Sequence, residues 1–200
     1  MTLRPPPRRL RELHLRTVKI RAANLFRISR FSSGEPFFGR TKANRFDDPT
    51  RVKKRRFGTC YCGLDLETAV AETLLHDEMP VRGNFKLSFS YFESHQLVAF
   101  KGGELILADL TGAQLKTLGG HGSLSTVVSY TVPQRWGLAV HRHPQSVDGI
   151  HYVSRHLNDR YAIVVFDRAS CKPGTPRYMP LPTAPGINAA LPLLHVSFPV

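Results

Sequence analysis

The chain has 200 residues, 42% of them hydrophobic, which is enough for one ordinary core and too few for two. Its 28 lysines and arginines against 15 aspartates and glutamates give a formal net charge of +13, which favours anionic partners such as nucleic acid, acidic protein surfaces or phosphate-bearing small molecules. No apolar run reaches the roughly 18 residues of a membrane span and no signal peptide is recognisable, so we expect one soluble, cytoplasmic domain.

The two ends of the chain differ in composition from its middle. Residues 1–20 combine a proline run with several arginines, which is typical of a flexible arm or a short peripheral helix. Residues 173–200 are again rich in proline and are expected to form a tail that packs on the domain surface. The compact domain is therefore expected over residues 21–172.

The first predicted strand lies at residues 25–28, and residues 29–56 then have the composition of a long loop. This loop contains a mixture of aromatic and basic residues, which favours an ordered, ligand-facing role. The chain is extended at 58–62, and an apolar stripe at helical spacing predicts a helix that begins after the capping residue Asp65 and reaches Leu74.

The rest of the chain predicts short strands with one further helix. The expected strands are 85–91, 97–100, 104–110, 149–154 and 161–166, and the expected helix is 134–141. Interspersed strands and helices of these lengths predict a mixed α/β (α+β) fold in a single domain, while the order of strands in the sheet stays open.

The three cysteines, Cys60, Cys62 and Cys171, are an odd number without a repeated pair spacing, which argues against a disulfide framework. A C-x-C pair supplies only two ligands, and no histidine pair at ligand spacing lies beside it. We therefore expect reduced thiols and no metal site.

Three segments in sequence order resemble the RES domain family, which is named for an arginine, a glutamate and a serine. ANRFDDP at 43–49 is similar to the arginine segment, YCGLDLETAVAETLLH at 61–76 to the tyrosine strand and glutamate helix, and DGIHYVSRH at 148–156 to the serine segment. YAIVVFDR at 161–168 resembles the closing strand of the family. The basic stretch 51–56 lengthens the gap between the first two segments.

The resemblance assigns site residues one by one. Arg45, Glu72 and Ser154 take the three eponymous places, Tyr61 matches the aromatic residue before the glutamate helix, and Arg27 resembles an arginine on the first strand. It implies a fold similar to ADP-ribosyltransferases and places a RES catalytic domain within residues 21–172.

The resemblance also implies a bacterial toxin that cleaves the nicotinamide–ribose bond of NAD, as a glycohydrolase or phosphorylase, or that transfers ADP-ribose to a protein. NAD is then the substrate, and no further cofactor is expected. The expected partner is a cognate antitoxin with a DNA-binding domain, and the resemblance leaves a homo-oligomer open.

This chemistry explains the residue types. Nicotinamide leaves through an oxocarbenium-like state, so the carboxylate of Glu72 would stabilise the developing positive charge and orient the ribose. Spacing alone favours the plainer interpretation that Glu72 is a solvated helical residue. The planar guanidinium groups of Arg45 and Arg27 suit a pyrophosphate, although any one of the 28 basic residues is more often a surface charge.

The remaining candidates have two interpretations each. Tyr61 would stack on nicotinamide or simply pack as a strand aromatic. Ser154 would bond a ribose hydroxyl or orient Glu72, and it lacks the partners of a nucleophilic serine. His151 and His156, which flank it, are assigned structural or surface roles. The basic stretch 51–56 is a solvated loop, or it docks an acidic antitoxin surface or steers an anionic substrate.

Two alternatives come from other classes. The excess of basic residues also suits a nucleic-acid-binding or RNA-targeting toxin without NAD turnover, which we do not favour because no binding motif is recognisable. The second alternative is a family member that has lost the activity and keeps the fold as an interaction partner.

Overall fold

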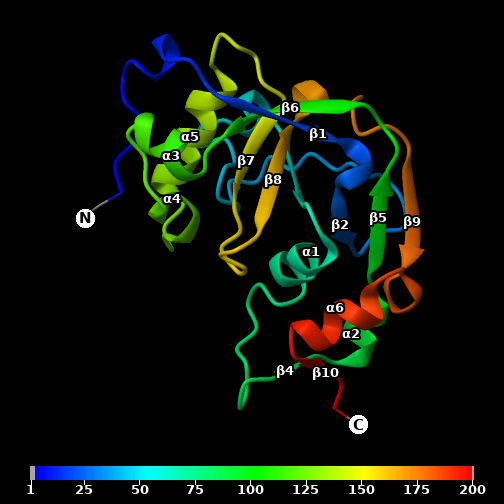
Figure 1. Ribbon diagram of the computed structural model, residues 1–200. Helices are drawn as coiled ribbons and strands as arrows, with labels where there is room; N and C mark the ends of the chain where they lie inside the picture. The colour runs from blue at the N-terminus through cyan, green and yellow to red at the C-terminus, as the bar shows by residue number, and fades with distance from the viewer. Residues whose placement is uncertain (1–2, 200) are drawn as a thin grey trace.

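An eight-stranded mixed sheet organises the chain, in the order β1-β6-β7-β8-β3-β2-β5-β9 (Figure 1). The computed structural model describes residues 3–199. Neighbouring strands are antiparallel except for the parallel pair β6 and β7. The strands of this sheet are β1 Thr17–Arg21, β2 Phe26–Ser29, β3 Thr59–Gly63, β5 Gln96–Phe100, β6 Glu104–Asp109, β7 Gly149–Val153, β8 Tyr161–Phe166 and β9 Pro176–Pro180.

Short helices cover the sheet at both ends. They are α1 Leu66–Thr73, α2 Phe89–Glu93, α3 Gly112–Thr117, α4 Ser123–Thr126, α5 Thr131–His141 and α6 Ile187–Leu193. Figure 1 shows α3, α4 and α5 gathered at one end of the sheet and α2 and α6 at the other. A separate parallel pair joins β4 Phe85–Lys86 to β10 Val196–Ser197.

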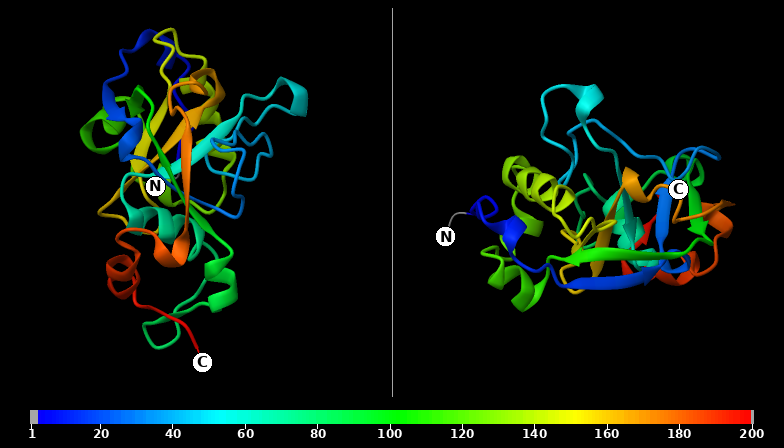
Figure 2. Two further views of the ribbon diagram at one scale, coloured as in Figure 1. Left: turned by 90° about the vertical axis from the view of Figure 1, so that its right-hand side faces the viewer. Right: turned by 90° about the horizontal axis from the view of Figure 1, so that it is seen from above.

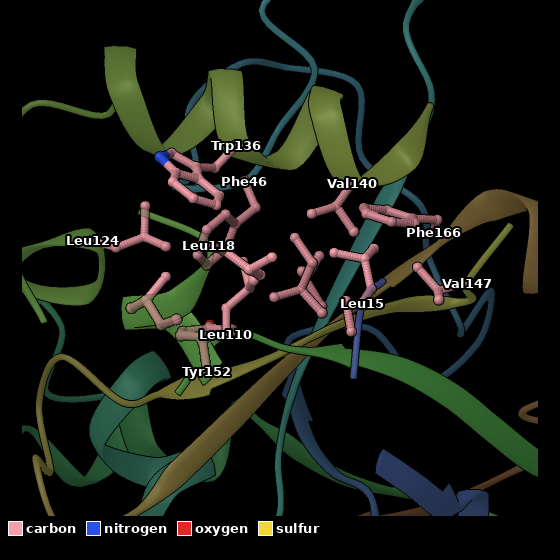
Figure 3. Packing of buried hydrophobic residues seen from close by; sticks show 14 of the residues in the cluster. Leu15, Phe46, Leu110, Leu118, Leu124, Trp136, Val140, Val147, Tyr152 and Phe166 are labelled. Atoms are coloured by element: carbon pink, nitrogen blue, oxygen red, sulfur yellow. The ribbon is translucent and has the colours of Figure 1, made fainter. Parts of the chain in front are cut away.

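The largest cluster of buried residues lies between α5 and the sheet. Figure 3 shows Trp136 and Val140 of α5 pointing down toward Phe46, Phe166 and the strands. Trp136, Phe46 and Phe166 are all fully buried. The loop that carries Arg45 is therefore anchored by its neighbour Phe46 in the core.

Most predicted elements are confirmed. Strands β5, β6, β7 and β8 lie where the patterns predict them, and α1 begins after Asp65 as expected. Residues 29–56 are largely without regular structure, apart from the end of β2 and the 3-10 turn Lys53–Arg55. Figure 2 shows the segment around this turn projecting away from the body of the molecule.

The strand predicted at 85–91 is wrong. Only Phe85 and Lys86 are extended, and the chain turns into α2 at Phe89. Phe89 and Phe92, one helical turn apart, both contact Phe198 near the C-terminus. Phe89, one of the residues that suggested alternation, is therefore placed by helical packing against a distant segment.

Both ends of the chain take part in the fold. Leu10 and Leu15 join the main core, and β1 begins at Thr17, inside the stretch expected to be an arm. Near the C-terminus, β9 extends the sheet beside β5, and its terminal prolines, Pro176 and Pro180, are tolerated because β9 is an edge strand. In the described part of the chain, residues 3–199, no helix has the length and apolar character needed to cross a membrane.

Candidate active site

A cavity of about 530 Å³ opens between α1, the strands β2 and β3, and the loop that carries Arg45. Four residues predicted from the sequence line it, namely Arg27, Arg45, Tyr61 and Glu72. Segments far apart in sequence therefore meet at this cavity.

Glu72 is placed by the local sequence of α1. The side chain of Asp65 caps the helix by accepting a hydrogen bond from the Thr68 amide at 2.7 Å, and Val70 on the opposite face is fully buried. Gly63 allows the close approach of β3, because a Cβ there would lie 2.7 Å from the Ala69 nitrogen. The last turn then directs Glu72, half-buried, toward the cavity.

Ser154 holds the Glu72 carboxylate. Its hydroxyl donates to Glu72 Oε1 at 2.6 Å, and the Arg155 amide donates to the same oxygen at 3.1 Å. The Ser154 Oγ in turn accepts hydrogen bonds from the amides of His156 and Leu157. Ser154 is completely buried, so it reaches the cavity through Glu72.

Arg45 is a buried arginine with part of its hydrogen-bonding capacity unused. Only 6% of the residue is exposed, and its Nη1 donates to the carbonyl oxygens of Leu124 and Val127 at 3.2 and 3.0 Å. The guanidinium lies over the ring of Tyr130, with 4.8 Å from its carbon to the ring centre. Its Nη2 has no hydrogen-bond partner within residues 3–199.

This environment favours an anion beside Arg45. Burial lowers the pKa of Arg45 from its usual value, which means that the charged form is short of compensating interactions. An unpaired buried donor is costly, and a negatively charged ligand group in the cavity would satisfy it.

Tyr61 fastens the arginine loop to β3. Its hydroxyl accepts a hydrogen bond from the Phe46 amide at 2.8 Å and donates to Asp47 Oδ1 at 3.1 Å. Asp47 Oδ1 also accepts a hydrogen bond from Thr59 Oγ1 at 2.6 Å. Burial, and then the Asp47 charge, raise the pKa of Tyr61 well above its usual value, so the hydroxyl stays protonated.

Arg27 is already paired. Its Nε donates to Glu35 Oε2 at 2.7 Å, and its Nη1 donates to the Tyr61 carbonyl oxygen at 3.0 Å. Glu35 neutralises Arg27. Positive charge in the cavity therefore comes mainly from the other lining arginines, Arg30, Arg45 and Arg155. Arg27 lies at the site but differs from Arg45 in having an acidic partner.

Several lining residues were not singled out from the sequence. They are Arg30, His76, Tyr91, Tyr130, Tyr152 and Arg155. Tyr152 lies on β7, two residues before Ser154, which follows the strand. Side chains two residues apart along an extended chain lie on the same side, so this spacing could have revealed Tyr152. Burial, and then the Glu72 charge, raise the pKa of Tyr152 well above its usual value.

The two histidines that flank Ser154 differ in position. His151 is turned toward Asp109, with 3.4 Å between its Nδ1 and Asp109 Oδ1, and does not line the cavity. His156, by contrast, lies beside His76, with 4.9 Å between the ring centres. His156 was expected to be structural or superficial, yet the fold brings it next to Glu72.

Comparisons with known proteins bear on the family and the fold of the chain. The family model described as the RES domain matches residues 24–181. Among solved structures, a chain of the M. tuberculosis MbcT-MbcA toxin-antitoxin complex superimposes with a TM-score of 0.57 at 13% identity, covering 86% of this chain and 87% of that one. That likeness shows a shared fold and confirms the mixed α/β class. No curated protein sequence matches the chain.

Proposed function

The chain belongs to the RES domain family, and from this premise we propose that it is an enzyme that cleaves the nicotinamide–ribose bond of NAD. The observation that carries the proposal is the Glu72 carboxylate, held by Ser154 and the Arg155 amide at the wall of a cavity that Arg45 also lines. NAD enters as the substrate, and we propose no further cofactor.

Glu72 supplies the charge that the reaction needs. As the bond between ribose C1′ and the nicotinamide nitrogen breaks, the electron pair leaves with nicotinamide and positive charge grows on the sugar. A carboxylate that is already oriented stabilises this charge without reorganising during the reaction. Water or phosphate then adds to C1′, and a proton is released when the acceptor is water.

The other cavity residues bind the dinucleotide. The unpaired Nη2 of Arg45 suits an oxygen of the pyrophosphate, and Arg155 adds a second positive charge at the same wall. The rings of Tyr61, Tyr130 and Tyr152 line the cavity and suit a flat nicotinamide. Ser154 acts as a positioning residue because it touches Glu72 and is itself buried.

The first experiment measures NAD consumption by the purified protein, with nicotinamide and ADP-ribose products separated in the presence and absence of phosphate. We expect Glu72→Gln to lower kcat by about 100- to 1,000-fold, the usual cost of removing a transition-state charge interaction. Glu67→Gln is the matched control, because Glu67 lies on the same helix and does not line the cavity.

Turnover that survives in folded Glu72→Gln protein would remove Glu72 from this role. No NAD loss by the folded wild-type protein would move the proposal to ADP-ribosylation of a protein, in which the same bond breaks and the acceptor differs. It would equally favour a nucleic-acid-binding toxin, which salt-dependent binding of RNA or DNA would detect.

We also propose that the protein acts as a toxin held by an antitoxin. The similar solved structure is a toxin-antitoxin complex. The 3-10 turn Lys53–Arg55 consists of three basic residues, and the segment around it projects from the body of the molecule (Figure 2). An acidic antitoxin surface would complement this turn. Mixing the protein with its antitoxin should abolish NAD turnover, and charge reversal at Lys53 and Lys54 should weaken that inhibition.

A further inference from the structure

Three side chains of types that can ligate a metal converge beside the cavity. Glu72, His76 and His156 place one carboxylate oxygen and two ring nitrogens within 4.8 Å of one another. Glu72 and His76 are four residues apart, about one helical turn, across the end of α1, and His156 comes from the segment after β7. No other group of this kind occurs within residues 3–199.

His156 has a nitrogen that the protein leaves unused. Its Nε2 is buried and has no hydrogen-bond partner in the described part of the chain. The backbone beneath it is fixed, because the His156 amide donates to Ser154 Oγ at 3.2 Å. A buried nitrogen without a partner costs free energy, and a bound cation beside it would remove that cost.

Glu72 retains an oxygen for a ligand. Both hydrogen bonds that it receives from Ser154 and Arg155 end on Oε1, so Oε2 is free of them. The carboxylate is therefore oriented by the protein while one of its oxygens remains available, as is usual for carboxylate ligands with supporting hydrogen bonds.

The ligand set suits zinc. Two histidines and one carboxylate, with a fourth position open to water, are a common Zn²⁺ arrangement. Bonds of about 2.0–2.2 Å in tetrahedral geometry separate ligand atoms by roughly 3.3–3.6 Å, so ligand atoms that now lie up to 4.8 Å apart must close by up to about 1.5 Å. His76 can make this movement because 39% of its side chain is exposed. Magnesium and calcium prefer oxygen ligands alone.

We infer that Glu72, His76 and His156 form a Zn²⁺ site whose occupation inhibits the enzyme. The inhibitory part rests on the proposed function, whereas the binding part does not. A Glu72 carboxylate bound to Zn²⁺ is no longer free to face the ribose, and the ion puts positive charge where the reaction develops its own. Chelation would then restore activity.

The test is calorimetric titration of the full-length protein with Zn²⁺, in a Cys171→Ser background so that this exposed thiol does not compete. We expect one Zn²⁺ per chain and no binding of Mg²⁺. His156→Gln and His76→Gln should each weaken Zn²⁺ binding at least about tenfold, because each removes one of three protein ligands. His14→Gln, at an exposed histidine outside the cluster, is the control and should bind as the parent does.

A second measurement compares NAD turnover with and without Zn²⁺ for each protein, so that any change in basal activity cancels. Inhibition should be strong in the parent and reduced in His156→Gln. Absence of stoichiometric binding, or binding unchanged in both histidine variants, would overturn the site, and binding without inhibition would overturn its inhibitory role. Zinc binding by a protein that never consumes NAD would instead refute the proposed function and leave the site standing.

Discussion

The hydroxyl of Ser154 makes three hydrogen bonds, one to Glu72 and two from the amides that follow it. We predict that Ser154→Ala lowers kcat by about 10- to 100-fold, because a carboxylate displaced by a fraction of an ångström loses much of its effect. The KM for NAD should change little, since Ser154 is fully buried behind Glu72. Steady-state kinetics and a thermal melt of the variant separate this effect from loss of fold. A raised KM with an unchanged kcat would instead mean that Ser154 contacts the substrate.

Only the family resemblance could identify these site residues in advance. Glu72 has the spacing of a solvated helical residue, and what holds it is Ser154, 82 positions later in the chain. Arg45 is likewise recognisable only through distant partners, the carbonyl oxygens of Leu124 and Val127. Local patterns report local structure, so they carry no signal for these contacts. The pairing of His76 with His156 was missed for the same reason.

At the scale of elements, α5 touches the arginine loop through Gly137. A Cβ at this position would lie 2.5 Å from the carbonyl oxygen of Phe46. In an exposed helix, Gly→Ala would stabilise the protein by about 1 kcal/mol. Here we predict the opposite sign, a decrease of about 1–3 kcal/mol in the free energy of unfolding from overpacking. We also expect a raised KM for NAD, because the displaced Phe46 directly follows Arg45.

Denaturant unfolding and NAD kinetics of Gly137→Ala test this prediction. Gly103→Ala is a suitable comparison, because nothing lies within 4 Å of a Cβ at Gly103. If Gly137→Ala is as stable as the wild-type protein, the helix and the loop can separate at little cost, and the loop is then less firmly held than its contacts indicate.

Elements with several agreeing local signals could be predicted, and those defined by distant contacts could not. Helix α1 has a capping aspartate and an apolar stripe, and β8 is a continuous buried run. Strand β1 alternates polar and apolar residues (TVKIR), but it is only five residues long and directly follows the proline- and arginine-rich stretch that predicted an arm. Its place in the sheet depends on pairing with β6. The order of strands in the sheet follows from such long-range pairings, which one sequence does not reveal.

At the scale of the whole molecule, His141 links helix, loop and sheet. Its ring stacks on Phe57, with 4.0 Å between ring centres, and packs edge-on against Phe166 of β8. Burial, and then the Arg168 charge, lower the pKa of His141 to about 4. His95 and His151 are also buried, and burial lowers the pKa of each.

These histidines predict loss of stability in acid. The pKa of His141 is lower in the folded protein than in the unfolded chain, so its contribution is complete above pH of about 6.5 and is lost as the pH falls through about 4. Allowing for its partial exposure, we expect His141 to account for a loss on the order of 1–2 kcal/mol in the free energy of unfolding. Urea unfolding at pH 7 and pH 4.5 measures it, and His141→Phe should show a smaller decrease. Equal decreases in both proteins would exclude His141 as a source.

The pairing of Glu72 with Ser154 also bears on how the protein is made. As the chain leaves the ribosome, α1 and Glu72 emerge long before Ser154, and β3 lacks its neighbour β8 until residues 161–166 have followed. Any nascent or truncated chain that stops before Ser154 therefore carries the carboxylate without its side-chain donor. The activity that we propose would therefore begin only after Ser154 and the strand β8 have been translated.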